Sequence, residues 1–112
     1  MMNIDDLLDK RPASFEQYLD LVEQALFEIN ELQRSAEYDE ESLGETLFFV
    51  ADLGKSVRAL RTSLEDGSYR HADTDLAFMS LVESQDLEAL PFKYLLRIIN
   101  TTHRNGLRED GD

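Results

Sequence analysis

Apolar side chains recur at heptad spacing through residues 14–37, and this pattern constrains the fold more than any other feature of the chain. They fill every a and d position of three heptads: Phe15, Tyr18, Val22, Ala25, Ile29, Leu32 and Ala36. Leu19 and Leu26 widen the apolar stripe. Ser14-Phe15-Glu16-Gln17 is a capping box, whose side chains satisfy free backbone N–H groups at a helix start. The pattern predicts a long amphipathic helix that packs against another helix.

A second long helix is expected over residues 42–66. A second capping box, Ser42-Leu43-Gly44-Glu45, begins it, and Gly67 ends it. Its apolar positions are Leu43, Leu47, Val50, Leu53, Val57, Leu60 and Leu64. Because the polar connection over residues 37–41 is short, the second helix should run back antiparallel to the first.

Shorter helices are expected on both sides of this pair. They cover residues 4–10, residues 74–84, and a last stretch from Asp86 or Pro91 to Asn105. Residues 68–73 are expected as a turn and residues 107–112 as a disordered tail. Strand-like alternation is nearly absent. The sequence therefore predicts an all-α fold: one compact helical-bundle domain over residues 1–106, with about four to five helices built on the long antiparallel pair.

Glycine and phenylalanine positions in the long helices indicate further packing. A glycine inside a helix costs about 1 kcal/mol relative to alanine, so Gly54 is expected where a neighbouring helix approaches closely. Phe27 and Phe48 fall on outer faces of the two long helices, away from the heptad seam. These rings need a second covering layer, which either the last two helices or another copy of the chain would supply. The sequence leaves both alternatives open, a homodimer among them.

The chain is strongly acidic. Its 24 acidic and 11 basic residues give a net charge of −13, and residues 1–45 alone hold 13 acids against 3 bases. A field of that sign repels nucleic-acid phosphates and favours basic partners. No apolar run is long enough to span a membrane, no signal-peptide pattern is visible and no cysteine occurs, so a cytoplasmic protein is expected.

The last predicted helix carries a basic stripe. Lys93, Arg97 and Arg104 fall on one of its faces. In a DNA-binding protein such a helix enters the major groove. In so acidic a chain we expect the stripe instead to lie across the acidic helix of residues 14–37, or to meet an acidic patch of another chain. His71 and His103 are expected to be exposed polar residues near helix ends.

Signatures of nucleophilic serine catalysis and of phosphate-binding glycine loops are absent from the sequence, which leaves carboxylates as the groups able to support chemistry. Glu28 and Glu31 have an ExxE spacing, which places both side chains on one helix face, where they suit Mg²⁺.

The segment Glu41-Ser42-Leu43-Gly44-Glu45-Thr46-Leu47-Phe48 resembles part of a known family. MazG-type all-α nucleotide pyrophosphohydrolases carry an ExxE on one helix and a segment like EELGDLLF on the next. Leu43, Gly44, Leu47 and Phe48 match that segment, whereas Glu45 stands in place of its aspartate and Ser42 in place of its second glutamate. The resemblance implies a Mg²⁺ site at Glu28, Glu31 and Glu45. The alternative interpretation of the same residues is a capping box and a solvated acidic face.

These features predict an acidic protein-binding module, acting as a regulator, adaptor or inhibitor of a basic partner protein, with neither catalytic activity nor a cofactor. Its binding surface is expected at Asp20, Glu23, Phe27, Glu31 and Phe48. Neither nucleic acid nor a membrane is expected as a partner. The alternative function is a divergent magnesium-dependent pyrophosphohydrolase.

Overall fold

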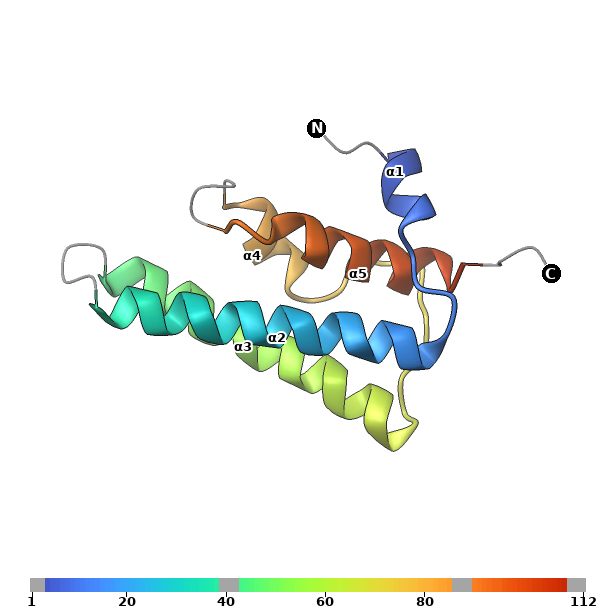
Figure 1. The fold of residues 1–112 in the computed structure, drawn as a ribbon, viewed down its shortest axis with the longest axis horizontal. Helices are drawn as coiled ribbons and strands as arrows, with labels where there is room; N and C mark the ends of the chain where they lie inside the picture. Colours follow the sequence, from blue (N-terminus) through green and yellow to red (C-terminus); the bar gives the residue numbers. More distant parts are fainter. Residues whose placement is uncertain (1–3, 39–42, 86–89, 109–112) are drawn as a thin grey trace.

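The computed structural model describes residues 4–38, 43–85 and 90–108, and for residues 4–6, 36–38 and 43–48 it describes the backbone alone. Within these residues the chain is all-α, as expected, with five helices and no strand. The helices are α1 (Ile4–Asp9), α2 (Phe15–Tyr38), α3 (Leu43–Asp66), α4 (Met79–Glu83) and α5 (Lys93–Asn105). The long helices α2 and α3 run antiparallel and form the strongest helix pair, as the sequence predicts (Figure 1).

The heptad seam of α2 supplies the centre of the core. Its buried side chains are Tyr18, Val22, Ala25, Leu26 and Ile29, and those of α3 are Val50, Leu53, Val57 and Leu60. Full burial of one such aliphatic side chain contributes about 1.5–3 kcal/mol, so this pair is the main source of apolar stabilisation. The heptad assignment is wrong at Phe15, whose side chain is 52% exposed. It lies at the first turn of α2, where it packs against the loop that follows α3.

Gly54 lies where α2 and α3 approach each other, as expected. It is buried, and a Cβ atom built on it would lie 3.4 Å from Cγ2 of Ile29 on α2. The same Cβ would lie 3.2 Å from Nη1 of Arg58, one turn further along α3. A large side chain at this position would therefore push the two helices apart.

The last two helices cover one side of the α2–α3 pair (Figure 1). They and their connections complete the core with Phe78, Met79, Val82, Leu90, Leu96 and Ile99. The chain itself thus supplies a covering layer, but this layer leaves Phe27 60% exposed. Helix α1 lies against α5 and projects from the bundle (Figure 1). Leu107 packs against the core, and the N–H of Arg108 donates a hydrogen bond to the carbonyl of Pro12 at 2.8 Å.

The helix expected over residues 74–84 is much shorter than its pattern indicates, since α4 begins only at Met79. A side chain of α5 binds the backbone of the segment that precedes α4. Oδ1 of Asn100 accepts a hydrogen bond from the N–H of Leu76 at 2.8 Å. The side-chain amide of Asn100 also donates to Oδ1 of Asp75 at 3.0 Å. These tertiary hydrogen bonds hold the segment in an irregular conformation, which apolar spacing alone does not reveal.

Candidate functional site

The candidate binding surface is the outer side of α2. Asp20, Glu23, Phe27 and Glu31 follow one another at intervals of three or four residues and are all exposed. We call these four residues the acidic face of α2. Residues at this spacing share one side of a helix, so the structure brings these four predicted partner-binding residues together. The fifth, Phe48, lies outside the described side chains.

Phe27 is the apolar centre of the acidic face. The buried seam of Val22 and Ile29 occupies the opposite side of α2, which leaves Phe27 60% exposed. The only other large apolar side chain exposed among the described residues is Phe15, and its ring stacks on that of His71 with a centroid distance of 5.7 Å. Phe27 therefore combines a large area of exposed apolar surface with neighbouring carboxylates.

A groove of about 470 Å³ adjoins the acidic face between the C-terminal half of α2 and the two residues that precede α5. Leu32, Pro91 and Phe92 give it apolar walls, and Glu28 and Glu31 supply negative charge. Glu31 thus belongs to both the groove and the acidic face. Its Oε1 lies 3.2 Å from Nη1 of Arg34, and both side chains are well exposed. Such a pair contributes at most about 1 kcal/mol, so the cation of a partner can replace Arg34.

The residues expected to bind Mg²⁺ are only partly within the described structure. Glu28 and Glu31 line the groove together, but Glu31 is already paired with Arg34, and the side chain of Glu45 lies outside the described part. Among the described residues, no three histidine, aspartate or glutamate side chains lie close enough to hold one metal ion.

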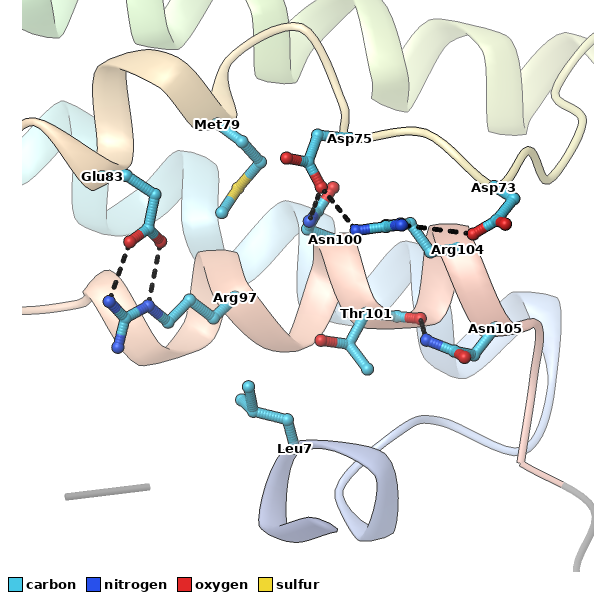
Figure 2. Close-up of a pocket in the computed structure, with 10 residues that line it drawn as sticks. All are labelled: Leu7, Asp73, Asp75, Met79, Glu83, Arg97, Asn100, Thr101, Arg104 and Asn105. Carbon is cyan, nitrogen blue, oxygen red and sulfur yellow. Dashed lines mark hydrogen bonds and ion pairs between the residues drawn. The ribbon is translucent and has the colours of Figure 1, made fainter. Parts of the chain in front are cut away.

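The side chains of the basic stripe of α5 bind groups of the same chain, as Figure 2 shows for Arg97 and Arg104. Arg97 donates two hydrogen bonds to the carboxylate of Glu83, at 3.0 and 2.9 Å. Arg104 lies between Asp75 and Asp73, at 3.2 and 3.3 Å, and buried Lys93 donates to the carbonyl of Gln85 at 2.6 Å. The expectation that the stripe lies across the acidic helix α2 is therefore wrong.

A cleft of about 400 Å³ separates these ion pairs from Leu7 of α1 (Figure 2). The hydrogen bonds from the Arg97 guanidinium hold the pKa of Glu83 below its usual value. Because the charged groups around this cleft bind one another, they act as a clamp that fixes the segment before α4, and α4 itself, on α5.

A cluster of hydroxyl and imidazole groups, which the sequence analysis missed, joins the loop after α3 to α2 and α5. Oη of Tyr69 lies 2.7 Å from Nδ1 of His103, 3.2 Å from Nδ1 of His71 and 3.3 Å from Oη of Tyr18. Tyr18 donates its own proton to the carbonyl of Ile99 at 3.0 Å. The expectation that His103 is exposed is wrong, because it is buried next to Tyr69. The sequence feature that could have indicated this cluster is the presence of Tyr69 and His71 in the turn expected over residues 68–73.

Burial sets the protonation states in this cluster. It raises the pKa of the Tyr18 and Tyr69 hydroxyls and lowers the pKa of His103. The nearby charges of His71 and Arg104 lower the pKa of His103 further. The Tyr18 hydroxyl donates its hydrogen bond to the carbonyl of Ile99, and the shortest contact of the Tyr69 hydroxyl is with Nδ1 of His103. We therefore assign the Tyr69 proton to Nδ1 of neutral His103, which leaves the imidazole proton on Nε2.

The chain matches no protein-family model, no curated protein and no solved structure in the comparisons with known proteins. None of its described helices has the length and apolar character needed to cross a membrane. The assignment of a function therefore rests on the surface chemistry of the described residues.

Proposed function

We propose that the chain is a protein-binding module whose acidic face of α2 binds a basic segment of a partner protein. The observation that supports this function is Phe27, 60% exposed among the carboxylates of Asp20, Glu23 and Glu31. A lysine or arginine over an aromatic ring contributes about 0.5–2 kcal/mol, depending on how far it is desolvated. The carboxylates would attract the same cation and speed its approach.

The groove beside the acidic face extends this surface. Its apolar walls, Leu32, Pro91 and Phe92, would accept an aliphatic side chain, while Glu28 and Glu31 bind cations at its rim. The partner segment is therefore amphipathic as well as basic. A helix that carries arginine and leucine on one face has both features.

A basic partner suits this surface better than a second copy of the chain. A symmetric dimer through Phe27 would bring two acidic faces together, and like charges in contact oppose association. The module would act as a regulator, adaptor or inhibitor without catalysis. Because the chain contains no cysteine, we place it in a reducing compartment, the cytoplasm.

A magnesium-dependent pyrophosphohydrolase is the second candidate function. It is favoured by the shared position of Glu28 and Glu31 on the groove and by the resemblance of residues 41–48 to the second carboxylate segment of MazG-type enzymes. A titration with millimolar Mg²⁺, followed by amide NMR, tests it. Unchanged signals at Glu28, Glu31 and Glu45 would exclude this candidate.

The binding function is tested with labelled helical peptides and fluorescence anisotropy. One peptide carries arginine and leucine on one face, and its control carries glutamate in place of arginine. We expect only the arginine peptide to bind. Reversing Asp20, Glu23 and Glu31 to lysine should weaken its binding at least about tenfold, because three attractive charges become repulsive.

A matched reversal separates a local surface from net charge. Asp9, Asp52 and Glu65 are also exposed, but they lie on α1 and α3. Their reversal to lysine changes the net charge by the same amount, and we expect it to weaken peptide binding by less than about threefold. Equal losses in the two triple variants would show that overall charge, and no particular face, attracts the peptide.

A further inference from the structure

A separate hollow of about 330 Å³ lies between α3, the segment of residues 68–78 and α5. Its polar part is formed by Ser56, Ser63, Ser68, Arg70 and His103. We call it the hydroxyl pocket. It shares no residue with the acidic face of α2, and its size is at the lower end of the range for small-molecule sites, about 300–1,000 Å³.

The charge of the hydroxyl pocket is opposite to that of the chain as a whole. None of its lining residues is acidic, although the net charge of the chain is −13. Asp66, the acidic residue nearest to Ser68 in the sequence, accepts a hydrogen bond from the Ser68 N–H at 2.8 Å. The pocket wall thus presents the Ser56 hydroxyl, an imidazole and a guanidinium, because the hydroxyl of Ser63 donates to the carbonyl of Leu60 at 2.7 Å and that of Ser68 to Asp66.

Arg70 is the cation best placed to bind an anion there. Its Nη1 donates to the carbonyls of Gly67 and Tyr69, at 3.1 and 2.7 Å, which holds the guanidinium against the loop. Unlike Arg97 and Arg104, it forms no ion pair with a carboxylate of the described residues. A held guanidinium with remaining N–H groups suits a carboxylate, which accepts two hydrogen bonds side by side.

His103 supplies a second donor. Tyr69 binds its Nδ1 at 2.7 Å, so Nε2 is the ring nitrogen that this contact does not use. With the Tyr69 proton on Nδ1, Nε2 carries the imidazole proton and donates. The remaining wall of the pocket is apolar and includes Leu60, Leu76 and Phe78.

We propose that the hydroxyl pocket binds a small organic carboxylate with an apolar body, whose carboxylate is held by Arg70 and His103. The apolar body lies against Leu60, Leu76 and Phe78. The pocket volume suits a ligand of roughly ten heavy atoms. This site shares no residue with the protein-binding surface, so a result that contradicts one proposal does not contradict the other.

Benzoate is the probe for this site, and amide NMR is the measurement. We expect benzoate to shift the signals of Ser68, Tyr69 and Leu76 saturably. Benzyl alcohol, which has the same ring without the charge, should bind at least about tenfold more weakly, because it lacks the charge-assisted hydrogen bonds. Inorganic phosphate should also bind more weakly, because it cannot use the apolar wall.

Two variants with one matched control locate the binding. Arg70→Gln should weaken benzoate binding at least about tenfold, whereas Arg34→Gln, which removes an exposed arginine outside the pocket, should leave it unchanged. Ala77→Trp, at an exposed position of the pocket wall, should block binding sterically without touching the core.

Three results would overturn the proposal. The first is the absence of saturable shifts at the pocket residues. The second is equal binding of benzoate to the Arg70→Gln and Arg34→Gln variants. The third is binding of benzyl alcohol or phosphate as tight as that of benzoate. None of these results bears on peptide binding by the acidic face of α2.

Discussion

Oη of Tyr69 lies 2.7 Å from Nδ1 of His103, 34 residues further along the chain. This contact joins the loop after α3 to the last turn of α5. Edge-on contacts between the Tyr69 ring and those of Tyr18, His71 and His103, with centroid distances of 5.1–5.6 Å, support it. One tyrosine side chain thus ties the loop to both α2 and α5.

Removal of the Tyr69 hydroxyl should destabilise the fold. Tyr69→Phe keeps the ring contacts but leaves Nδ1 of buried His103 without its donor. An unsatisfied buried polar group costs about 1–3 kcal/mol, and we expect a loss of that size in the free energy of unfolding, measured with urea. Tyr94→Phe, on the partly exposed side of α5, is the control and should change stability by less than about 0.5 kcal/mol. Equal stabilities of the two variants would show that the Tyr69–His103 bond contributes nothing.

Stability should fall as the solution becomes mildly acidic. The pKa of His103 is lowered in the folded protein, first by burial and then by the charges of His71 and Arg104, which Asp75 partly opposes. The unfolded chain therefore takes up a proton at His103 near its ordinary pKa of about 6.5, before the folded protein does. The free energy of unfolding should decrease as pH falls below about 6.5, and this contribution should level off below the folded pKa.

His103→Gln tests this pH dependence, because the variant loses one titrating group and keeps the others. Its free energy of unfolding should vary less with pH in the same window than that of the unmodified protein. The lowered pKa of Glu83 produces a separate loss, below about pH 4.5, which both proteins should share. A wild-type and a variant curve of the same slope between pH 6.5 and 5 would contradict the prediction.

The sequence predicts those parts of the fold that depend on helical periodicity. The apolar residues of α2 at positions 18, 22, 25 and 29 are buried as the heptad pattern requires, and the antiparallel α2–α3 pair follows from the short connection. Periodicity fails where a distant side chain binds the backbone, as Asn100 does at Leu76. No local signal in residues 74–78 reveals that hydrogen bond.

The outward-facing residues of α2 could be predicted from the sequence as well as its buried residues. An outer helix face is defined by the same periodicity as the buried one, so the outward position of Phe27, Asp20 and Glu23 followed directly from the sequence. The pairing of the α5 arginines with Glu83 and with Asp73 and Asp75 depends on where an irregular segment lies. The burial of His103 depends on the same segment, so neither feature followed from a helix pattern.

Gly54 offers a test of the close approach between α2 and α3. Gly54→Ala should stabilise the protein by up to about 1 kcal/mol through helix propensity, because the nearest atom to the new Cβ is the mobile end of Arg58. Gly54→Leu should destabilise it by about 1–3 kcal/mol, because the larger side chain meets Ile29. Urea unfolding of both variants gives the comparison. A stabilising leucine would mean that the helices are not in contact at this residue.

Asn100 should be essential for the irregular segment before α4. Asn100→Leu removes the acceptor of the Leu76 N–H, and we expect a loss of about 1–3 kcal/mol in the free energy of unfolding. Hydrogen exchange at the Leu76 amide should accelerate more than exchange in α2. Asn30→Leu, an exposed position of α2, is the control, with an expected change below about 0.5 kcal/mol. Unaltered protection at Leu76 would show that its hydrogen bond to Asn100 is not formed in solution.

The two components of the acidic face should act on different rate constants of partner binding. Carboxylates attract a basic segment from a distance, so reversal of Asp20, Glu23 and Glu31 to lysine should mainly lower the association rate constant. The loss should be largest at low salt, since charges more than about 8 Å apart are screened at physiological ionic strength. Phe27→Ser removes contact area that forms only in the complex, so it should mainly raise the dissociation rate constant. Stopped-flow measurements with the arginine–leucine peptide at low and high salt separate the two effects. An association rate that responds to neither salt nor the reversals would leave Phe27 and the groove as the whole of the binding surface, and the negative charge would then serve solubility alone.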